Sequence, residues 1–422
     1  MNLETIIPEM AASVNWKLEG KHLLSEDLRK QALSVLENMP FPTTRTEAWK
    51  YTRLAKIRTG KFVARQEQLA SNNHQIDSNA VSMVFVNGHF AANLSSSEFP
   101  DGIKLLALSQ MEAMELSVLG NSLPLEGELF NAFNTAYATD GVYLHISANM
   151  HIEPVIEITH ITTGDSTVSH VRNVIIAEAF SKAHVIQQYV TEDATTCFTN
   201  VVTEVSVAKN AFLTIDKLQY EDESCFTIAT EQVTQAVDSN FTINTLTLNG
   251  GLVRNNLNIG VNGHNCETHL NGAYILKGNQ HVDNHTVVDH TVAHCVSNEL
   301  YKGVIDEKAT AVFNGKVFVR KDAQKINAFQ SNGNVLLSDD ATVNSKPELE
   351  IYADDVKCSH GSTTGQLDDE AIFYLRARGI GEKAARQLMV GAFVGDVFGK
   401  LTNEAVKARV DLLMKERFGW DF

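Results

Sequence analysis

The sequence predicts a mainly β protein built around a long parallel β-helix, with helical regions at both ends. Three observations predict this fold. From about residue 141 to residue 350, short runs rich in Val, Ile, Thr and Phe follow one another with almost no helical period, separated by Asn and Gly. Similar turn sequences recur roughly 25 to 32 residues apart, which is typical of solenoid coils. Proline, which cannot donate a ladder hydrogen bond, is nearly absent from this stretch.

A β-helix explains the recurring turns better than a β-sandwich does. Each coil of a β-helix buries an apolar inward row, and the next coil supplies its hydrogen bonds. The crossover preference of parallel strands makes the predicted helix right-handed. The turns that mark the coils are Ala208-Lys-Asn-Ala, Val237-Asp-Ser-Asn, Asn262-Gly-His-Asn, Asp306-Glu-Lys-Ala and Ser338-Asp-Asp-Ala. We assign residues 136–350 to this core and expect its open end to be capped or paired, because unpaired strand edges invite another strand.

Residues 1–135 predict a helical and mixed region ahead of the core. Ser25 is a typical helix N-cap, and apolar residues then repeat at helical spacing until Pro40-Phe41-Pro42, which cannot continue the helix. We expect residues 1 to about 75 to be mostly helical. Residues 81–90 predict a strand with a turn at Asn87-Gly88.

Residues 351–422 predict a final strand and a module of three helices. Asp368 or Asp369 can cap the first helix, and Gly379 is a natural stop for it. An apolar stripe on the second helix must be buried against the β-helix, the other helices or a partner protein. The stripe residues that we single out as partner-docking candidates are Leu388, Met389 and Phe393.

Composition excludes several classes of function. The net charge of −16 over 422 residues disfavours nucleic acid and anionic membrane surfaces as partners. We find no Gly-x4-Gly-Lys-Ser/Thr phosphate loop and no Gly-x-Ser-x-Gly elbow, so the chain is not expected to be an ATPase or hydrolase of those types. The N-terminus lacks the features of a signal peptide, and no run of about 18 apolar residues is present. We therefore expect a cytoplasmic protein.

Five cysteines form a sparse and odd set, which favours a reducing compartment over a disulfide framework. Two pairs are one predicted coil apart: Cys197 with Cys225, and Cys266 with Cys295. We expect these pairs to stack inside the β-helix as small apolar fillers.

Residues 347–365 hold the strongest candidate site. Side chains alternate between the faces of a strand, so Cys358 and His360 share one face, about 7 Å apart at roughly 3.3 Å per residue. That spacing suits two ligands converging on one metal or cluster. A tetrahedral site needs about four ligands, so the others must come from elsewhere, such as another chain. The same pair also fits a packed thiol beside a surface imidazole.

A histidine-rich run at residues 281–295 also attracts notice. Strand parity places His281, Asp283 and His285 on one face and His290 with His294 on the other. No single face collects enough ligands for a metal, so we interpret the run as an outward polar face of a coil.

The run Glu350-Ile-Tyr-Ala-Asp-Asp-Val-Lys-Cys-Ser-His-Gly361 resembles the C-terminal signature of the SufB/SufD family of the Suf iron–sulfur cluster assembly system. The resemblance continues through Asp368-Asp-Glu-Ala-Ile-Phe-Tyr-Leu-Arg-Ala-Arg-Gly-Ile380 to about residue 392. Thr44-Arg-Thr-Glu-Ala-Trp-Lys-Tyr-Thr52 is similar to the family's N-terminal region, and we expect Trp49 and Tyr51 there to be packing anchors. The absence of Cys-x-x-Cys and the chain length favour the D type over the B type.

The resemblance implies a right-handed β-helix and a non-catalytic scaffold. It implies pairing with the SufB-type paralogue, a docked SufC-type ATPase, and a homodimer when the chain is isolated. His360 first, and Cys358 second, would supply part of a transient iron–sulfur cluster site at the subunit interface, with no cluster firmly bound to the isolated chain. The C-terminal helices would be the ATPase-docking module.

Two alternatives from other classes stay open. One is a β-helix enzyme acting on polysaccharides, although such enzymes are usually exported. The other is a structural homodimer in which Cys358 is inert.

Overall fold

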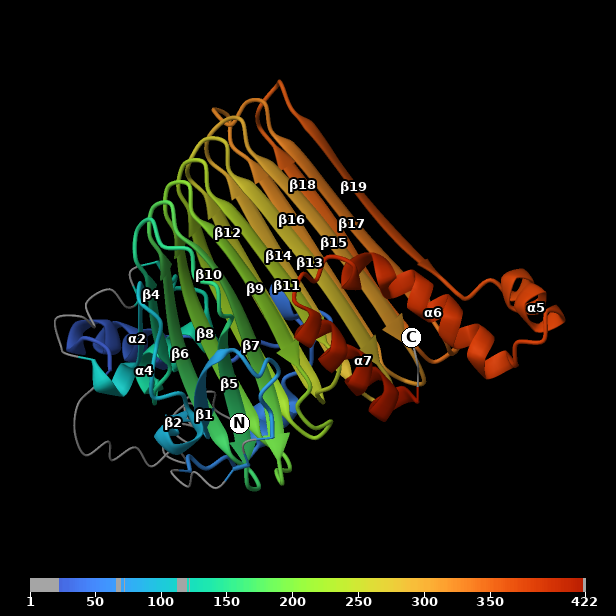
Figure 1. Cartoon of the computed structure of the whole chain (residues 1–422), viewed down its shortest axis with the longest axis horizontal. Helices are drawn as coiled ribbons and strands as arrows, with labels where there is room; N and C mark the ends of the chain where they lie inside the picture. The colour runs from blue at the N-terminus through green and yellow to red at the C-terminus, as the bar shows by residue number, and fades with distance from the viewer. Residues whose placement is uncertain (1–22, 66–69, 72, 112–119, 121, 420–422) are drawn as a thin grey trace.

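The computed structural model describes residues 23–65, 70–71, 73–111, 120 and 122–419. Its centre is a parallel β-helix, called the solenoid below, in which each coil gives one strand to each of two sheets (Figure 1). Within the described residues, the ten-stranded sheet holds the odd-numbered strands and β2, and the nine-stranded sheet holds β4 to β18 and β3. We call them the odd sheet and the even sheet. The predicted β-helix is confirmed.

The strands of the odd sheet are β1 Val81–Val86, β2 His89–Phe90, β5 Ile156–Thr163, β7 Lys182–Glu192, β9 Phe212–Gln219, β11 Asn240–Thr247, β13 Glu267–Leu276, β15 Val296–Ile305, β17 Asn327–Leu336 and β19 Lys357–Gly365. Those of the even sheet are β3 Ile103–Ala107, β4 Val142–Ile146, β6 Val168–Ala177, β8 Phe198–Val207, β10 Phe226–Gln235, β12 Leu252–Val261, β14 His281–His290, β16 Thr310–Val319 and β18 Thr342–Ile351. The helices are α2 Glu26–Asn38, α3 Ala55–Thr59, α4 Leu129–Tyr137, α5 Asp369–Ala377, α6 Glu382–Phe398 and α7 Glu404–Phe418, with short 3-10 helices at Glu47–Trp49, Ala92–Leu94 and Leu108–Gln110.

Strand register gives the coil length. Phe226 pairs with Leu252, 26 residues later, and Thr310 pairs with Thr342, 32 residues later; the other coils lie between these limits. The turns between strands contain residues in the left-handed region, which short polar side chains tolerate best. Examples are Asn210, Asp238 and Asn265, with φ of 55°, 58° and 59°. This backbone requirement explains the recurring Asn and Asp in the turn sequences.

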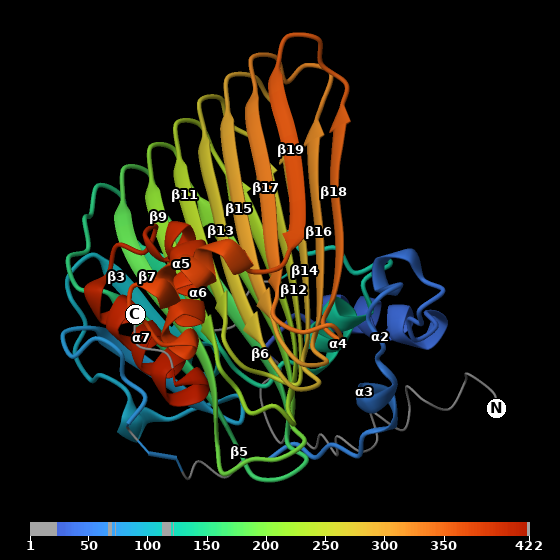
Figure 2. The same ribbon diagram turned by 90° about the vertical axis from the view of Figure 1, so that its right-hand side faces the viewer.

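The two ends of the chain cover opposite outer faces of the solenoid (Figure 2). α4 packs on the even sheet, where Phe130 meets Phe198 of β8 edge to face at 6.1 Å between ring centroids. α6 and α7 pack on the odd sheet, where Val394 and Val410 join a buried cluster with Leu218 of β9. Both modules therefore use the solenoid as their apolar partner. The cap of α5 by Asp368 and the positive φ of Gly379 agree with the prediction.

The interior is more polar than an apolar inward row predicts. Lys217 of β9 donates to Glu231 of β10 at 2.5 Å and to Asn255 of β12 at 2.9 Å, and all three side chains are buried. The desolvated ammonium persists because a carboxylate and an amide oxygen satisfy it. The two sheets are thus joined across the core by polar contacts as well as by apolar packing.

The N-terminal region differs from its prediction. Ser25 caps α2 as expected, and Asn87 and Gly88 form the turn between β1 and β2. After α2, however, the described part of residues 39–75 is mostly loop, with one 3-10 turn and the five-residue α3. The loop is held by distant contacts rather than by local propensity, since Trp49 and Phe62 lie in the cluster that covers the even sheet. Residues 1–22 lie outside the described residues.

The cysteine prediction needs one correction. Cys197 and Cys225 do stack one coil apart, but they form a disulfide that joins the starts of β8 and β10, with their Cα atoms 4.6 Å apart. Cys266 and Cys295 are buried free thiols, as fillers would be. The expectation of no disulfide is wrong because coil stacking alone brings equivalent positions within the usual Cα separation of a disulfide.

Candidate functional site at the open end of the solenoid

The two ends of the solenoid are finished differently. At the N-terminal end, the short antiparallel partners β2 and β3 close the odd and even sheets. At the other end, β18 and β19 are the last strands of their sheets, and no further strand pairs with them within the described chain. We call residues 342–365, which comprise β18, β19 and their connection, the open end.

Unpaired backbone groups line both strands of the open end. Lys357 N–H donates to the carbonyl of Ile326 at 2.8 Å, and Tyr352 N–H donates to Val319 at 2.9 Å. In a parallel ladder, alternate residues bond the same neighbour, so the N–H groups of Cys358 and His360 face away from β17. Pro347 occupies the corresponding outward position of β18, where its missing N–H costs the ladder nothing. The edge of β19 contains no proline and is available for pairing.

Cys358 and His360 lie on the inner side of β19. They pair in register with Ala328 and Gln330 of β17, both of which are buried. Cys358 is half-buried against the core, and burial raises the pKa of its thiol. His360 is exposed. The parity argument from the sequence therefore correctly places both side chains on one face, and that face looks over the end of the core.

The core itself is incompletely covered at this end. Val343, Leu349 and Val356 pack against the main core but are only partly buried. Ile351 and Tyr352 remain 39% and 57% exposed. Apolar rows that are sealed by the next coil elsewhere thus meet solvent here, which is typical of a surface that receives another protein.

A metal site within the chain is not present in the described part. No group of three or more His, Cys, Asp or Glu side chains gathers there in an arrangement that could hold a metal ion. Cys358 and His360 are at most two ligands of a site, as the sequence indicated. A cluster bound at this end would need further ligands from another chain.

The histidine-rich run holds the N-terminal segment. On β14, the carboxylate of Asp283 accepts from Arg254 at 2.7 Å and from His285 at 2.9 Å, and also from the Thr52 hydroxyl. Although burial opposes ionisation, these donors hold the pKa of Asp283 well below its usual range. The outward face was predicted, but the N-terminal segment covers it, and His290 points inward to Ser297 at 2.9 Å.

The aromatic pair of the N-terminal motif divides. Trp49 is buried, and the Arg254 guanidinium stacks over its ring at 3.9 Å from the centroid. Trp49 is therefore the packing anchor that was predicted. Tyr51 is 43% exposed, so that half of the prediction is wrong.

Comparison with known proteins settles the family. A family model described as the SufBD core domain of SUF system FeS cluster assembly matches residues 160–393, and a model of the SufBD N-terminal region matches residues 19–158. The chain belongs to the SufBD family. An iron–sulfur cluster assembly SufBD family protein of Synechocystis is 32% identical over 402 residues, covering 90% of this chain and 88% of the relative.

Proteins named SufD are among the relatives. The iron–sulfur cluster assembly protein SufD of Escherichia coli is 29% identical over 388 residues, covering 90% of both chains. SufD of Bacillus subtilis is 23% identical over 404 residues, covering 91% of this chain and 92% of the relative. The family resemblance and the β-helix read from the sequence are both confirmed. None of the helices in the described part of this SufBD chain has the length and apolarity that crossing a bilayer requires.

The C-terminal module of this SufBD chain exposes part of its apolar surface. α6 buries Val390, Val394 and Val397 against the odd sheet. Of the three docking candidates, Leu388 is 50% exposed, Met389 is half-buried, and Phe393 is half-buried beneath Lys302, whose Nζ lies 4.8 Å from the ring centroid.

Sequence reasoning missed the most exposed aromatic residues of the SufBD module. Phe373 and Tyr374 on α5 are 71% and 56% exposed, and α5 projects away from the solenoid beyond α6 (Figure 1). The signal was present, since three apolar residues in a row on a nine-residue helix cannot all face one side.

Proposed function

We propose that this SufBD-family chain is a D-type, non-catalytic scaffold subunit of a SUF complex. Its open end pairs with a SufB-type paralogue, and Cys358 and His360 contribute to a transient interface site where a nascent iron–sulfur cluster is held as cargo. Its C-terminal module docks a SufC-type ATPase. The observation that carries the proposal is the pair of unpaired end strands that present a thiol and an imidazole from one inner side.

Backbone chemistry supports the pairing step. β18 and β19 each offer a strand-length row of N–H and C=O groups, and a second solenoid with the same coil geometry can satisfy both rows at once. The same contact buries the exposed part of Ile351 and Tyr352. A second copy of this chain can use the same edge when the paralogue is absent, so the homodimer is the expected state of the isolated protein.

Ligand chemistry supports a shared site rather than a resident one. The pKa of the Cys358 thiol is raised by burial, so the isolated chain offers iron a protonated thiol. Thiolate is the usual protein ligand of iron–sulfur clusters, and imidazole replaces it in some of them. A cationic iron centre at the closed interface favours loss of the Cys358 proton, so assembly of the complex and ligation reinforce each other.

Exposed aromatic and aliphatic side chains support ATPase docking by α5 and α6. Phe373, Tyr374 and Leu388 present apolar surface that the solenoid leaves uncovered. Phe393 and Met389 contribute by seating α6 on the odd sheet, since Lys302 both covers the Phe393 ring and donates to its carbonyl at 2.7 Å.

The test is the cluster content of the complex after co-expression with the genomic neighbours of this chain. We expect His360→Ala to reduce iron and sulfide severalfold, and Cys358→Ala to reduce them less, with subunit composition unchanged. His151→Ala, which removes an exposed histidine far along the chain from the open end, is the matched control. Wild-type iron and sulfide in both site variants would leave a structural role only, as in the inert-homodimer alternative.

A further inference from the structure

A row of inward-facing residues changes character as it approaches the open end. Five consecutive register pairs of the odd sheet connect one residue in each coil from β9 to β19. The row reads Ile215, Ile243, Leu270, Glu299, Gln330, His360. The three coils farther from the end are apolar at this position, and the last three are polar. Because neighbouring strands lie about 4.8 Å apart, the polar side chains follow one another directly to His360.

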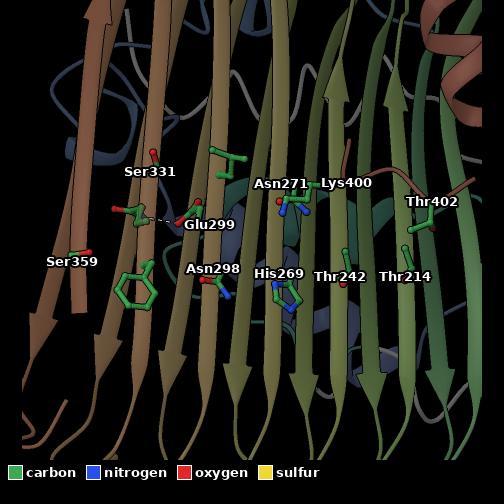
Figure 3. A pocket seen from close by; sticks show the side chains of 13 residues that line it. Thr214, Thr242, His269, Asn271, Asn298, Glu299, Ser331, Ser359, Lys400 and Thr402 are labelled. Carbon is green, nitrogen blue, oxygen red and sulfur yellow. Dashed lines mark hydrogen bonds between the residues drawn. The ribbon is translucent and has the colours of Figure 1, made fainter. Parts of the chain in front are cut away.

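The first two polar members are bonded to each other. Gln330 Nε2 donates to Glu299 Oε2 at 2.7 Å (Figure 3, dashed line to Glu299). The other carboxylate oxygen of Glu299 accepts from the Thr286 hydroxyl of β14 at 2.6 Å. Glu299 and Gln330 are 5% and 3% exposed. The carboxylate therefore fixes the amide of Gln330, because only the NH₂ group can donate to it.

The other end of that amide is unsatisfied. Oε1 of Gln330 is buried and finds no hydrogen-bond partner among the described residues. Buried acceptors without partners are uncommon in native structures. With Nε2 held by the preceding coil, Oε1 is the free end of the amide, and His360 occupies the register position that follows.

The opposite sheet makes room for the amide. A Cβ built on Gly315 of β16 would lie 2.1 Å from Gln330 Nε2, so only glycine fits there without displacing the side chain. Glycine weakens the interior of a strand and often marks a close approach. An apolar side chain like those earlier in the row would fill this position without an unpaired acceptor, so simple packing does not explain Gln330.

We propose that Gln330 is a positioning residue for His360. When a partner closes the open end, the imidazole turns over the core and one ring N–H donates to Gln330 Oε1, while Glu299 keeps that oxygen facing the last coil. The hydrogen bond fixes the tautomer, and the opposite ring nitrogen is left with its lone pair directed to iron. The inference rests on the proposed role of His360 as a cluster ligand and adds the residues that orient it.

The test uses the co-expressed complex with three variants of the row. Gln330→Met keeps the volume and removes the acceptor, and we expect retained iron to fall by about tenfold, the usual effect of losing an outer-shell partner. Glu299→Gln lets the two amides adopt either orientation, so an intermediate loss is expected. The exchange Glu299→Gln with Gln330→Glu again presents an oxygen to His360 and is expected to restore retention.

The ring-nitrogen NMR shifts of His360 in ¹⁵N-histidine-labelled complex give the second readout. We expect one dominant tautomer in the parent complex and in the exchange variant, and a mixture in Gln330→Met. Parent-like iron and parent-like shifts in both Gln330→Met and Glu299→Gln, with iron lost in His360→Ala, would overturn the positioning role alone. Iron retained in His360→Ala would instead overturn the proposed function and the inference with it.

Discussion

The closed and open ends of one solenoid are built from coils of similar length but treat their strands in opposite ways. In β6, near the closed end, nine of ten residues are buried, whereas in β19 only Cys358 is even half-buried. Antiparallel strands close the first end, and α4 covers the even sheet beside it. Charged groups near the closed end find partners inside the chain, while the open end leaves backbone and ligand groups for another molecule. The comparison teaches that the fold is completed at one end and left to be completed by a partner at the other.

The largest expected effect comes from breaking the polar core near the closed end. Arg172 is fully buried and donates to Glu204 at 2.6 Å. Arg172→Ala leaves that carboxylate buried without its cation, so we expect the free energy of unfolding to fall by about 3–5 kcal/mol. Denaturant unfolding of the purified chain measures it. The matched control is Arg320→Ala, whose partner Asp289 lies on the surface at 2.7 Å; a similar loss in both variants would remove the distinction between the regions.

Reducing the disulfide is expected to have the next largest effect. Cys197 and Cys225 close a loop of 28 residues between coils near the closed end, and the chain-entropy model gives such a crosslink about 3–4 kcal/mol. The unfolding midpoint should therefore fall in dithiothreitol. Cys197→Ala with Cys225→Ala should show no such dependence, and a midpoint that ignores reductant in the parent would contradict the crosslink.

A pH effect of intermediate size should come from Glu221. Burial raises its pKa to about 7, with the Thr227 and Thr199 hydroxyls opposing the shift. The folded state therefore holds this proton to higher pH than the unfolded state, and stability falls as pH rises from about 4.5 to 7. Glu221→Gln should gain stability relative to the parent across that window, on the order of 2 kcal/mol above pH 7. A difference that stays constant with pH would show that Glu221 does not titrate there.

The smallest expected effect on the isolated chain comes from an edge substitution at the open end. The N–H of Thr363 faces β17, whereas the N–H of Thr364 faces the free edge, by the alternation that begins with Lys357. Thr363→Pro should destabilise the last strand by removing a ladder bond. Thr364→Pro should leave the unfolding midpoint within about 0.5 kcal/mol of the parent. Hydrogen exchange of β19 amides in the two variants gives a residue-level check.

Much of the fold was readable from the sequence because its signals are local. The turns require left-handed residues such as Asn210 and Asp238, and apolar rows recur at the coil length. Residues 39–62 were not readable, because contacts with strands far away in sequence hold them, as Arg254 holds Trp49. The disulfide was missed because coil spacing places two cysteines side by side without fixing the direction of their Cβ atoms.

The candidate site was readable in part for a similar reason. Strand parity is a local property, so it placed Cys358 and His360 on one face correctly. The row that leads from Glu299 through Gln330 to His360 depends on register between coils of 31 and 30 residues. Unequal coil lengths hide that alignment in a single sequence.

Complex formation by Thr364→Pro tests the central claim most directly. The variant chain is co-expressed with the B-type paralogue, and association is measured by size-exclusion chromatography beside the parent and beside the isolated variant, whose fold serves as its own reference. If the open end completes itself by strand pairing, the isolated variant stays folded with parent-like stability while its association with the paralogue is lost. Association at parent affinity, with the variant folded, would contradict the account.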